Sequence, residues 1–123
     1  MCIFCEKYSN KDNIIYENDK VFAFYDAFPV SKGHILIVTK RHLESFFETN
    51  DDEKKAITKA LSDLKEITDK TYKPDGYNIG VNIGESAGQT IMHLHIHLIP
   101  RYQGDTDDPR GGVRGVIPNK QKY

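Results

Sequence analysis

Three of the five histidines in this chain stand at alternate positions in one short run, His93-Leu94-His95-Ile96-His97-Leu98-Ile99-Pro100. Because successive side chains on a β-strand point to opposite faces, this alternation predicts a strand with its histidines on one face. Met92, Leu94, Ile96 and Leu98 would form the other, apolar face and anchor the strand in a core. Imidazole can serve as nucleophile, acid or metal ligand near neutral pH, so the pattern predicts a reaction centre on this strand.

The composition indicates one domain over residues 1–123. Its 123 residues suit a single core, and 38% hydrophobic with 28% charged residues is typical of a soluble globular protein. A net charge of −1 argues against a broad surface for a nucleic-acid polymer, although a nucleotide needs only a few local donors. The chain shows neither an apolar run of the roughly 18 residues that span a membrane nor a signal-peptide core. We therefore expect a cytoplasmic protein without membrane partners.

The periodicity of the remaining chain predicts an α+β fold. Residues 14–17 and 21–26 flank a turn and predict an antiparallel hairpin, and residues 35–39 are a β-branched run typical of a buried strand. Residues 77–82 alternate as another strand, which with the histidine strand makes about five. Residues 102–123 form a polar tail rich in Gly and Pro, with no clear periodicity.

One long helix is predicted from about residue 50 to residue 72. Asn50 can cap it, Glu53 stands in capping-box register, and Pro74 ends it. A short helix is predicted within residues 43–48. The apolar side chains that recur at helical spacing in the long helix are Ile57, Ala60, Leu61, Leu64 and Ile67.

The two cysteines, Cys2 and Cys5, stand in a C-x-x-C spacing. In a reducing compartment this spacing indicates metal ligands or a redox dithiol rather than a structural disulfide. Two free thiols near the terminus are the plain alternative, because a zinc site needs two further ligands. The spacing alone leaves these interpretations open.

The histidine strand also allows three interpretations: packing, a metal tripod with an open position, or nucleophilic attack by the middle imidazole on phosphorus. The preceding Gly88-Gln89-Thr90 favours nucleophilic attack. Glycine permits close backbone approach, and the Gln and Thr side chains with the loop amides can donate to phosphate oxygens. An imidazole that attacks a phosphate ester needs such donors to stabilise the developing charge.

The run from Gly88 to Arg101 resembles the signature of the histidine triad superfamily, His-φ-His-φ-His-φ-φ, in which φ is apolar. The resemblance covers nearly the whole chain, because Ile3-Phe4, Phe24-Tyr25-Asp26 with Pro29, and residues 33–37 stand in the order that this family uses. It implies an α+β fold of about five antiparallel strands with one long and one short helix.

The resemblance implies a nucleotidyl hydrolase or transferase that acts on an α-phosphate. His95 would attack phosphorus to form a nucleotidyl-histidine, which water then hydrolyses. His97 would contact the phosphate, and His34 would support the triad from the neighbouring strand. The implied substrate contacts are Asn82, Gly88, Gln89 and Thr90 with the phosphate or leaving group, Asp26 with the ribose, and Ile3, Phe4, Phe24 and Ala27 with a purine base.

Some members of this superfamily carry a structural zinc ion. It is held by an N-terminal C-x-x-C, a histidine after the central strand and the first histidine of the triad. Those positions are Cys2, Cys5, His42 and His93 here, a Cys₂His₂ set of the closed tetrahedral type. The resemblance implies no organic cofactor. It also implies a homodimer formed through the long helix and an adjoining strand edge, for which residues 77–82 are the candidate.

The tail from Gly104 to Pro118 resembles the ends of short prokaryotic members assigned as dinucleoside polyphosphate hydrolases. Arg110, Arg114 and Lys120 would then meet the far phosphates, whereas a solvated tail is the plain alternative. We expect hydrolysis of dinucleoside polyphosphates. A nucleoside phosphoramidate hydrolase and a nucleotide-binding regulatory protein remain the alternatives.

Overall fold

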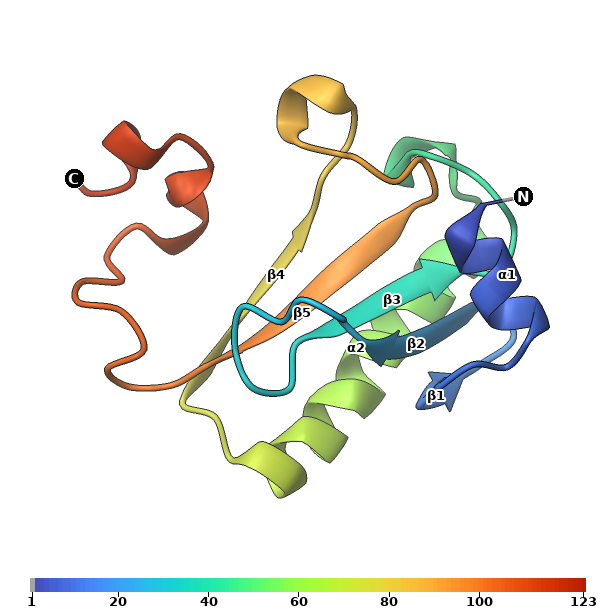
Figure 1. Cartoon of the computed structure of the whole chain (residues 1–123), viewed down its shortest axis with the longest axis horizontal. Helices are drawn as coiled ribbons and strands as arrows, with labels where there is room; N and C mark the ends of the chain where they lie inside the picture. The colour runs from blue at the N-terminus through green and yellow to red at the C-terminus, as the bar shows by residue number, and fades with distance from the viewer. Residues whose placement is uncertain (1) are drawn as a thin grey trace.

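Five antiparallel strands form one sheet in the order β1-β2-β3-β5-β4 in the computed structural model, which describes residues 2–123 (Figure 1). The strands are β1 (Tyr16–Glu17), β2 (Val21–Tyr25), β3 (Ile35–Thr39), β4 (Gly76–Val81) and β5 (His95–Arg101). Each neighbouring pair is antiparallel. The predicted α+β class and the predicted strands are therefore confirmed, with ends shifted by one or two residues.

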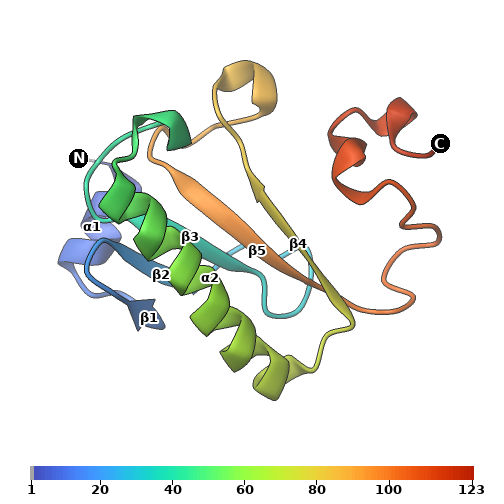
Figure 2. The ribbon, with the colours of Figure 1, turned by 180° about the vertical axis from the view of Figure 1, so that it is seen from behind.

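The long helix α2 (Asp51–Tyr72) crosses one face of this sheet (Figure 2). The Asn50 side chain accepts a hydrogen bond from the Glu53 amide at 2.8 Å, and the Glu53 carboxylate accepts one from the Asn50 amide at 3.0 Å, which confirms the capping box. Ile57, Ala60 and Leu64 are buried against the strands. Ile67 is 45% exposed, contrary to the predicted stripe, because the buried face continues from Leu64 to Thr68, one helical turn away.

The opposite face of the sheet carries a short helix that the sequence pattern did not reveal. Helix α1 (Ile3–Ser9) spans two turns, too few for a hydrophobic period to be recognised. The Cys2 sulfur caps it by accepting a hydrogen bond from the Cys5 amide at 3.4 Å. Its buried residue Phe4 joins a second apolar cluster with Phe22, Phe24, Leu36 and Val38. The two apolar clusters thus lie on opposite faces of one sheet.

The histidine strand begins two residues later than predicted. β5 starts at His95, because the Leu94 amide donates to the Leu43 carbonyl at 2.7 Å instead of joining the ladder. The alternation itself is confirmed: Leu94, Ile96 and Leu98 are buried in the cluster beneath α2. Met92, expected on the same apolar side, is half-buried and belongs to neither buried cluster.

The remaining elements are single turns. The short helix predicted within residues 43–48 is the 3₁₀ turn η1 (Phe46–Glu48), and η2 (Glu85–Ala87) lies in the loop before Gly88. The tail forms two further 3₁₀ turns, η3 (Gly112–Val116) and η4 (Pro118–Lys120), which stand beside the outer end of the sheet (Figure 1). Within residues 2–123, no helix combines the length and the apolar composition of a membrane span.

Candidate active site

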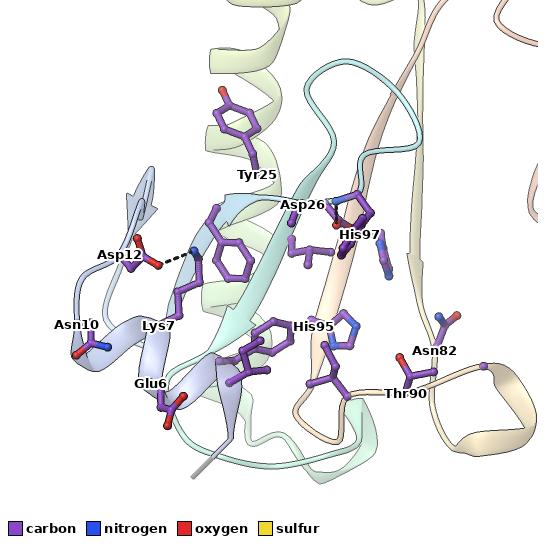
Figure 3. A pocket seen from close by; sticks show the side chains of 18 residues that line it. Glu6, Lys7, Asn10, Asp12, Tyr25, Asp26, Asn82, Thr90, His95 and His97 are labelled. Atoms are coloured by element: carbon purple, nitrogen blue, oxygen red, sulfur yellow. Dashed lines mark hydrogen bonds and ion pairs between the residues drawn. The ribbon is translucent and has the colours of Figure 1, made fainter.

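A cleft of about 550 Å³ opens on the sheet face that α2 leaves free. Its floor comes from β2, β3 and β5, and its walls come from α1, the loop after β2 and the loop before β5 (Figure 3). The structure brings together ten predicted site residues in the lining, namely Ile3, Phe4, Phe24, Asp26, Ala27, Asn82, Gly88, Thr90, His95 and His97. His34 and Gln89 do not line the cleft. His34 forms a hydrogen bond with His97, and Gln89 forms hydrogen bonds with backbone groups of the loops.

The orientation of the His95 ring is fixed by a hydrogen bond to the backbone just before β5. Its Nδ1 atom lies 2.8 Å from the His93 carbonyl oxygen. A carbonyl only accepts, so neutral His95 carries its proton on Nδ1 and keeps the Nε2 lone pair free. The Phe4 ring packs against the imidazole in a T-shaped arrangement, with 5.2 Å between ring centres. The cleft therefore contains an oriented imidazole with a free nitrogen lone pair.

His34 sets the tautomer of His97 through a second hydrogen bond. The Val30 amide donates to His34 Nδ1 at 3.2 Å, so neutral His34 carries its proton on Nε2. That proton is donated to His97 Nδ1 at 2.9 Å, which leaves the proton of neutral His97 on its own Nε2. His34 is only 2% exposed and Asp26 Oδ2 lies 3.5 Å from its Nε2. His34 thus sets the tautomer of His97 without itself lining the cleft.

Both of these imidazoles are held neutral. Burial lowers the pKa of His34, against the opposing charge of Asp26. Burial, together with the neighbouring imidazoles of His34 and His95, lowers the pKa of His97 to about 4. At neutral pH His97 therefore presents one N–H donor toward the cleft and carries no charge.

One end of the cleft carries hydrogen-bonding side chains for an anionic group. Asn82 follows β4, Thr90 precedes β5, and Figure 3 shows their side chains next to each other across the cleft from Lys7. Gly88 supports this loop in a left-handed conformation, with φ of 93°, that favours glycine. The carboxylate of Asp26 accepts a bond from the Phe28 amide at 2.9 Å, which fixes the turn at the rim.

The side chain of Gln89 does not reach the cleft, contrary to its predicted role as a phosphate donor. It is 4% exposed, and its amide nitrogen donates to the carbonyls of Glu44 and Ile91 at 3.0 and 3.2 Å. Its amide oxygen accepts from the Gly84 amide at 2.9 Å. All of these bonds tie the loop together, so Gln89 positions its neighbours Gly88 and Thr90.

The predicted metal ligands converge at the N-terminal end of β5. The donor atoms of Cys2, Cys5, His42 and His93 all lie within 4.8 Å of one another. His93 Nε2 donates to the Thr39 carbonyl at 2.7 Å, so its Nδ1 lone pair faces the sulfurs of Cys2 and Cys5 at 3.3 and 3.6 Å. His42 Nδ1 lies 3.4 Å from Cys5 Sγ.

These separations match a tetrahedral zinc ion. With Zn–S of about 2.3 Å and Zn–N of about 2.0 Å, tetrahedral ligand atoms lie roughly 3.3–3.8 Å apart. The cluster could therefore bind zinc. His93 belongs to this cluster and does not line the cleft, whereas the other two histidines of the run, His95 and His97, line the cleft.

Sequence reasoning missed the residues at the other end of the cleft. Glu6, Lys7, Asn10 and Asp12 line it there and come from α1 and the turn that follows. No signal in the sequence pointed to them, because α1 itself was not predicted. Phe28 also lines the cleft, with 87% of its surface exposed.

Comparison with known proteins identifies the family of this chain. The family model described as the HIT domain matches residues 7–104. An uncharacterised HIT-like protein of Methanocaldococcus jannaschii is 44% identical over 119 residues, covering 94% of this chain and 92% of that protein.

Solved structures give the same result. A HIT family protein from Bacillus anthracis has a TM-score of 0.79 at 35% identity, covering 85% of this chain and 75% of that one. A zinc-bound histidine triad family protein from Mycobacterium smegmatis has a TM-score of 0.78 at 28% identity, covering 87% and 79%. On its sequence and its fold, this chain belongs to the HIT family.

Proposed function

We propose that the protein hydrolyses nucleotides at the α-phosphorus through a covalent nucleotidyl-His95. The observation that carries this proposal is the bond from His95 Nδ1 to the His93 carbonyl, which leaves the Nε2 lone pair free in the cleft. The lone pair forms a P–N bond while the bond from phosphorus to the leaving group breaks. Water then attacks phosphorus and releases a proton to the solvent, the P–N bond breaks, and the imidazole recovers its lone pair.

The cleft residues supply the contacts that such a substrate needs. The Nε2–H of His97 and the side chains of Asn82 and Thr90 donate to the phosphate oxygens. Asp26 accepts hydrogen bonds from the ribose hydroxyls. The base lies in the apolar slot formed by Ile3, Phe4, Phe24 and Ala27.

For the leaving group we propose the remainder of a dinucleoside polyphosphate. Phe28 supports this choice, because an exposed ring at the cleft rim offers a stacking surface to a second base. A protein named AP-4-A phosphorylase from Mycobacterium tuberculosis is 28% identical over 80% of this chain, and this chain covers 52% of it. A protein named adenylylsulfatase from Arabidopsis thaliana is 34% identical over 85%, and this chain covers 54% of it.

The tail gives no support to that choice within one chain. Arg110, Arg114 and Lys120 do not line the cleft. The guanidinium of Arg114 donates to the carbonyls of Lys120 and Gln121 at 3.0 and 3.3 Å, inside the tail itself. Within one chain these cations are therefore not placed along the cleft in which we propose that the substrate binds.

We propose a structural zinc ion at Cys2, Cys5, His42 and His93. Four protein ligands complete a tetrahedron and leave no position for substrate, so a bound ion would supply a cross-link rather than catalysis. The cross-link joins α1 to the segment before β5. Because α1 carries Ile3 and Phe4, the ion would hold one wall of the base slot in place.

We also propose that a second copy of this chain pairs at β4. This strand is an edge of the sheet and pairs only with β5. Ile79 on β4 is 51% exposed and Ile67 on α2 is 45% exposed. The Tyr77 hydroxyl donates to Asp69 at 2.6 Å, which shows that the two elements adjoin. A second copy would cover both apolar side chains and satisfy the edge.

Replacement of the nucleophile gives the first test. His95→Ala should reduce turnover of diadenosine tetraphosphate by about 10³-fold or more, because the covalent route is removed. Rapid quenching of the wild-type enzyme in denaturant at neutral pH, followed by mass spectrometry, should show an adenylyl group on His95. A variant that keeps its turnover would disprove the nucleophile assignment.

The same assay with an adenosine phosphoramidate would decide between the two leaving groups.

The protonation of His97 gives the second test. Its ring signals in an NMR titration should move with a midpoint near pH 4, since burial and two imidazoles lower its pKa to about 4. Asp26→Asn should lower the midpoint further, because the Asp26 charge opposes that shift. Between pH 6.5 and 4 this histidine is protonated in the unfolded chain and neutral in the folded chain. The contribution of His97 to the free energy of unfolding is therefore complete above pH 6.5 and is lost as the pH falls toward 4. A midpoint near 6.5 contradicts the prediction.

Metal content gives the third test. Protein purified without chelator should contain about one zinc ion per chain by elemental analysis, and His42→Ala should lose most of it. His95→Ala is the matched control, because it removes a neighbouring imidazole and keeps all four ligands. Chelator should lower the melting temperature of the wild type. Absence of zinc, with both thiols freely titratable, would rule the site out.

Association gives the fourth test. Sedimentation velocity at micromolar concentration should show twice the mass of one chain, and Ile79→Asp should shift it to one chain by placing a charge in the covered edge. Ile15→Asp, beside β1 at the opposite edge of the sheet, where Ile15 is 37% exposed, is the control and should remain a dimer. A wild type that sediments as a monomer would refute the proposed pairing.

A further inference from the structure

The end of the cleft opposite Asn82 and Thr90 is charged, and the proposed reaction does not use it (Figure 3). Lys7 Nζ lies 4.6 Å from the centre of the Phe24 ring and 3.6 Å from Asp12 Oδ2. Phe24 belongs to the proposed base slot. The ammonium therefore stands over one wall of the base slot, and the ion pair lies on the side of the slot away from the phosphate.

The backbone holds this ion pair in place through the end of α1. The Asp12 amide donates to the Lys7 carbonyl, the Lys11 amide donates to the Tyr8 carbonyl, each at 3.1 Å, and Lys11 is left-handed with φ of 52°. This is the Schellman motif, in which the residues at the Lys7 and Asp12 positions commonly share an apolar contact. Here the same two positions carry an ammonium and a carboxylate.

The accessibility of the two groups suits contact with a ligand. The Lys7 side chain is 20% exposed, because its stem runs along the cleft wall, and the Asp12 side chain is 60% exposed. Neither group has a second salt-bridge partner within residues 2–123. Both can therefore turn hydrogen-bonding atoms toward a planar group above Phe24 without breaking the fold.

The chemistry of the pair distinguishes between purines. An ammonium only donates and a carboxylate only accepts. Guanine carries the acceptor O6 beside two donors, N1–H and the N2 amine, which match the ammonium and both carboxylate oxygens. Adenine carries the N6 amine, which can donate one hydrogen bond to the carboxylate, beside the acceptor N1, which can accept one from the ammonium. Guanine thus makes one more charge-assisted hydrogen bond than adenine.

We propose that Lys7 and Asp12 read the edge of the base and select guanine over adenine. This inference rests on the proposed function, because it places a purine in the slot formed by Phe4 and Phe24. It names two specificity-determining residues that do not touch the reacting phosphorus. The preferred substrates are then guanosine nucleotides that carry the scissile bond at the α-phosphate.

Calorimetric titration of the full chain with three mononucleotides tests the inference. Guanosine 5′-monophosphate should bind about tenfold more tightly than adenosine 5′-monophosphate, the effect of one additional charge-assisted hydrogen bond. Inosine 5′-monophosphate should lie between them, because it keeps O6 and N1–H and lacks the amine. Lys7→Met and Asp12→Asn should each bring the guanosine-to-adenosine ratio to within about twofold.

Lys11→Met is the matched control, because it removes the same charge from the same end of α1. Lys11 Nζ lies 3.8 Å above the Tyr8 ring and 3.6 Å from Glu17, outside the cleft lining, so this variant should keep the wild-type ratio. Equal binding of the two nucleotides by the wild type, or a ratio that survives both substitutions, overturns the inference and leaves the proposed function standing. Binding of none of the three nucleotides overturns both.

Discussion

The pairing of β3 with β5 is the constraint on which the site depends. Its register sets Val38 opposite His95 and Leu36 opposite His97, and it places His34, just before β3, within reach of His97. A slip of one residue would turn every β5 side chain to the other face and send the imidazoles into the core beneath α2. The burial of Ile96 and Leu98 under that helix therefore also holds the His95 and His97 rings toward the cleft.

Backbone groups then assign a different task to each imidazole. A carbonyl fixes the proton of His95 on Nδ1, an amide fixes that of His34 on Nε2, and His34 in turn fixes His97. The Thr39 carbonyl turns the Nδ1 atom of His93 toward the cysteines. In our proposal the same side chain thus serves as nucleophile, phosphate donor, positioning residue and metal ligand, according to which ring nitrogen the backbone occupies.

Helix α1 links the candidate metal cluster to the cleft. Its first turn carries Cys5 to this candidate metal cluster and Phe4 to the proposed base slot, and its last turn carries Lys7 to the charged end of the cleft. A helix of seven residues has little stability of its own. Burial of Phe4 among the β2 and β3 side chains, and in our proposal a zinc ion, hold it against the sheet.

The sequence alone determined the parts whose cause is local or periodic. Alternation at residues 94–98 set the two faces of β5, the capping box at Asn50 set the start of α2, and the histidine spacing with Gly88 indicated the family. Tertiary structure decided the rest, because the deciding contacts join residues far apart in the chain. Only the fold buries Gln89 among loop carbonyls, separates His93 from the cleft and sets Lys7 beside Phe24. The spacing of side chains in the sequence specifies which residues share a face of a strand or helix. Which residues contact that face is decided by packing in the tertiary structure.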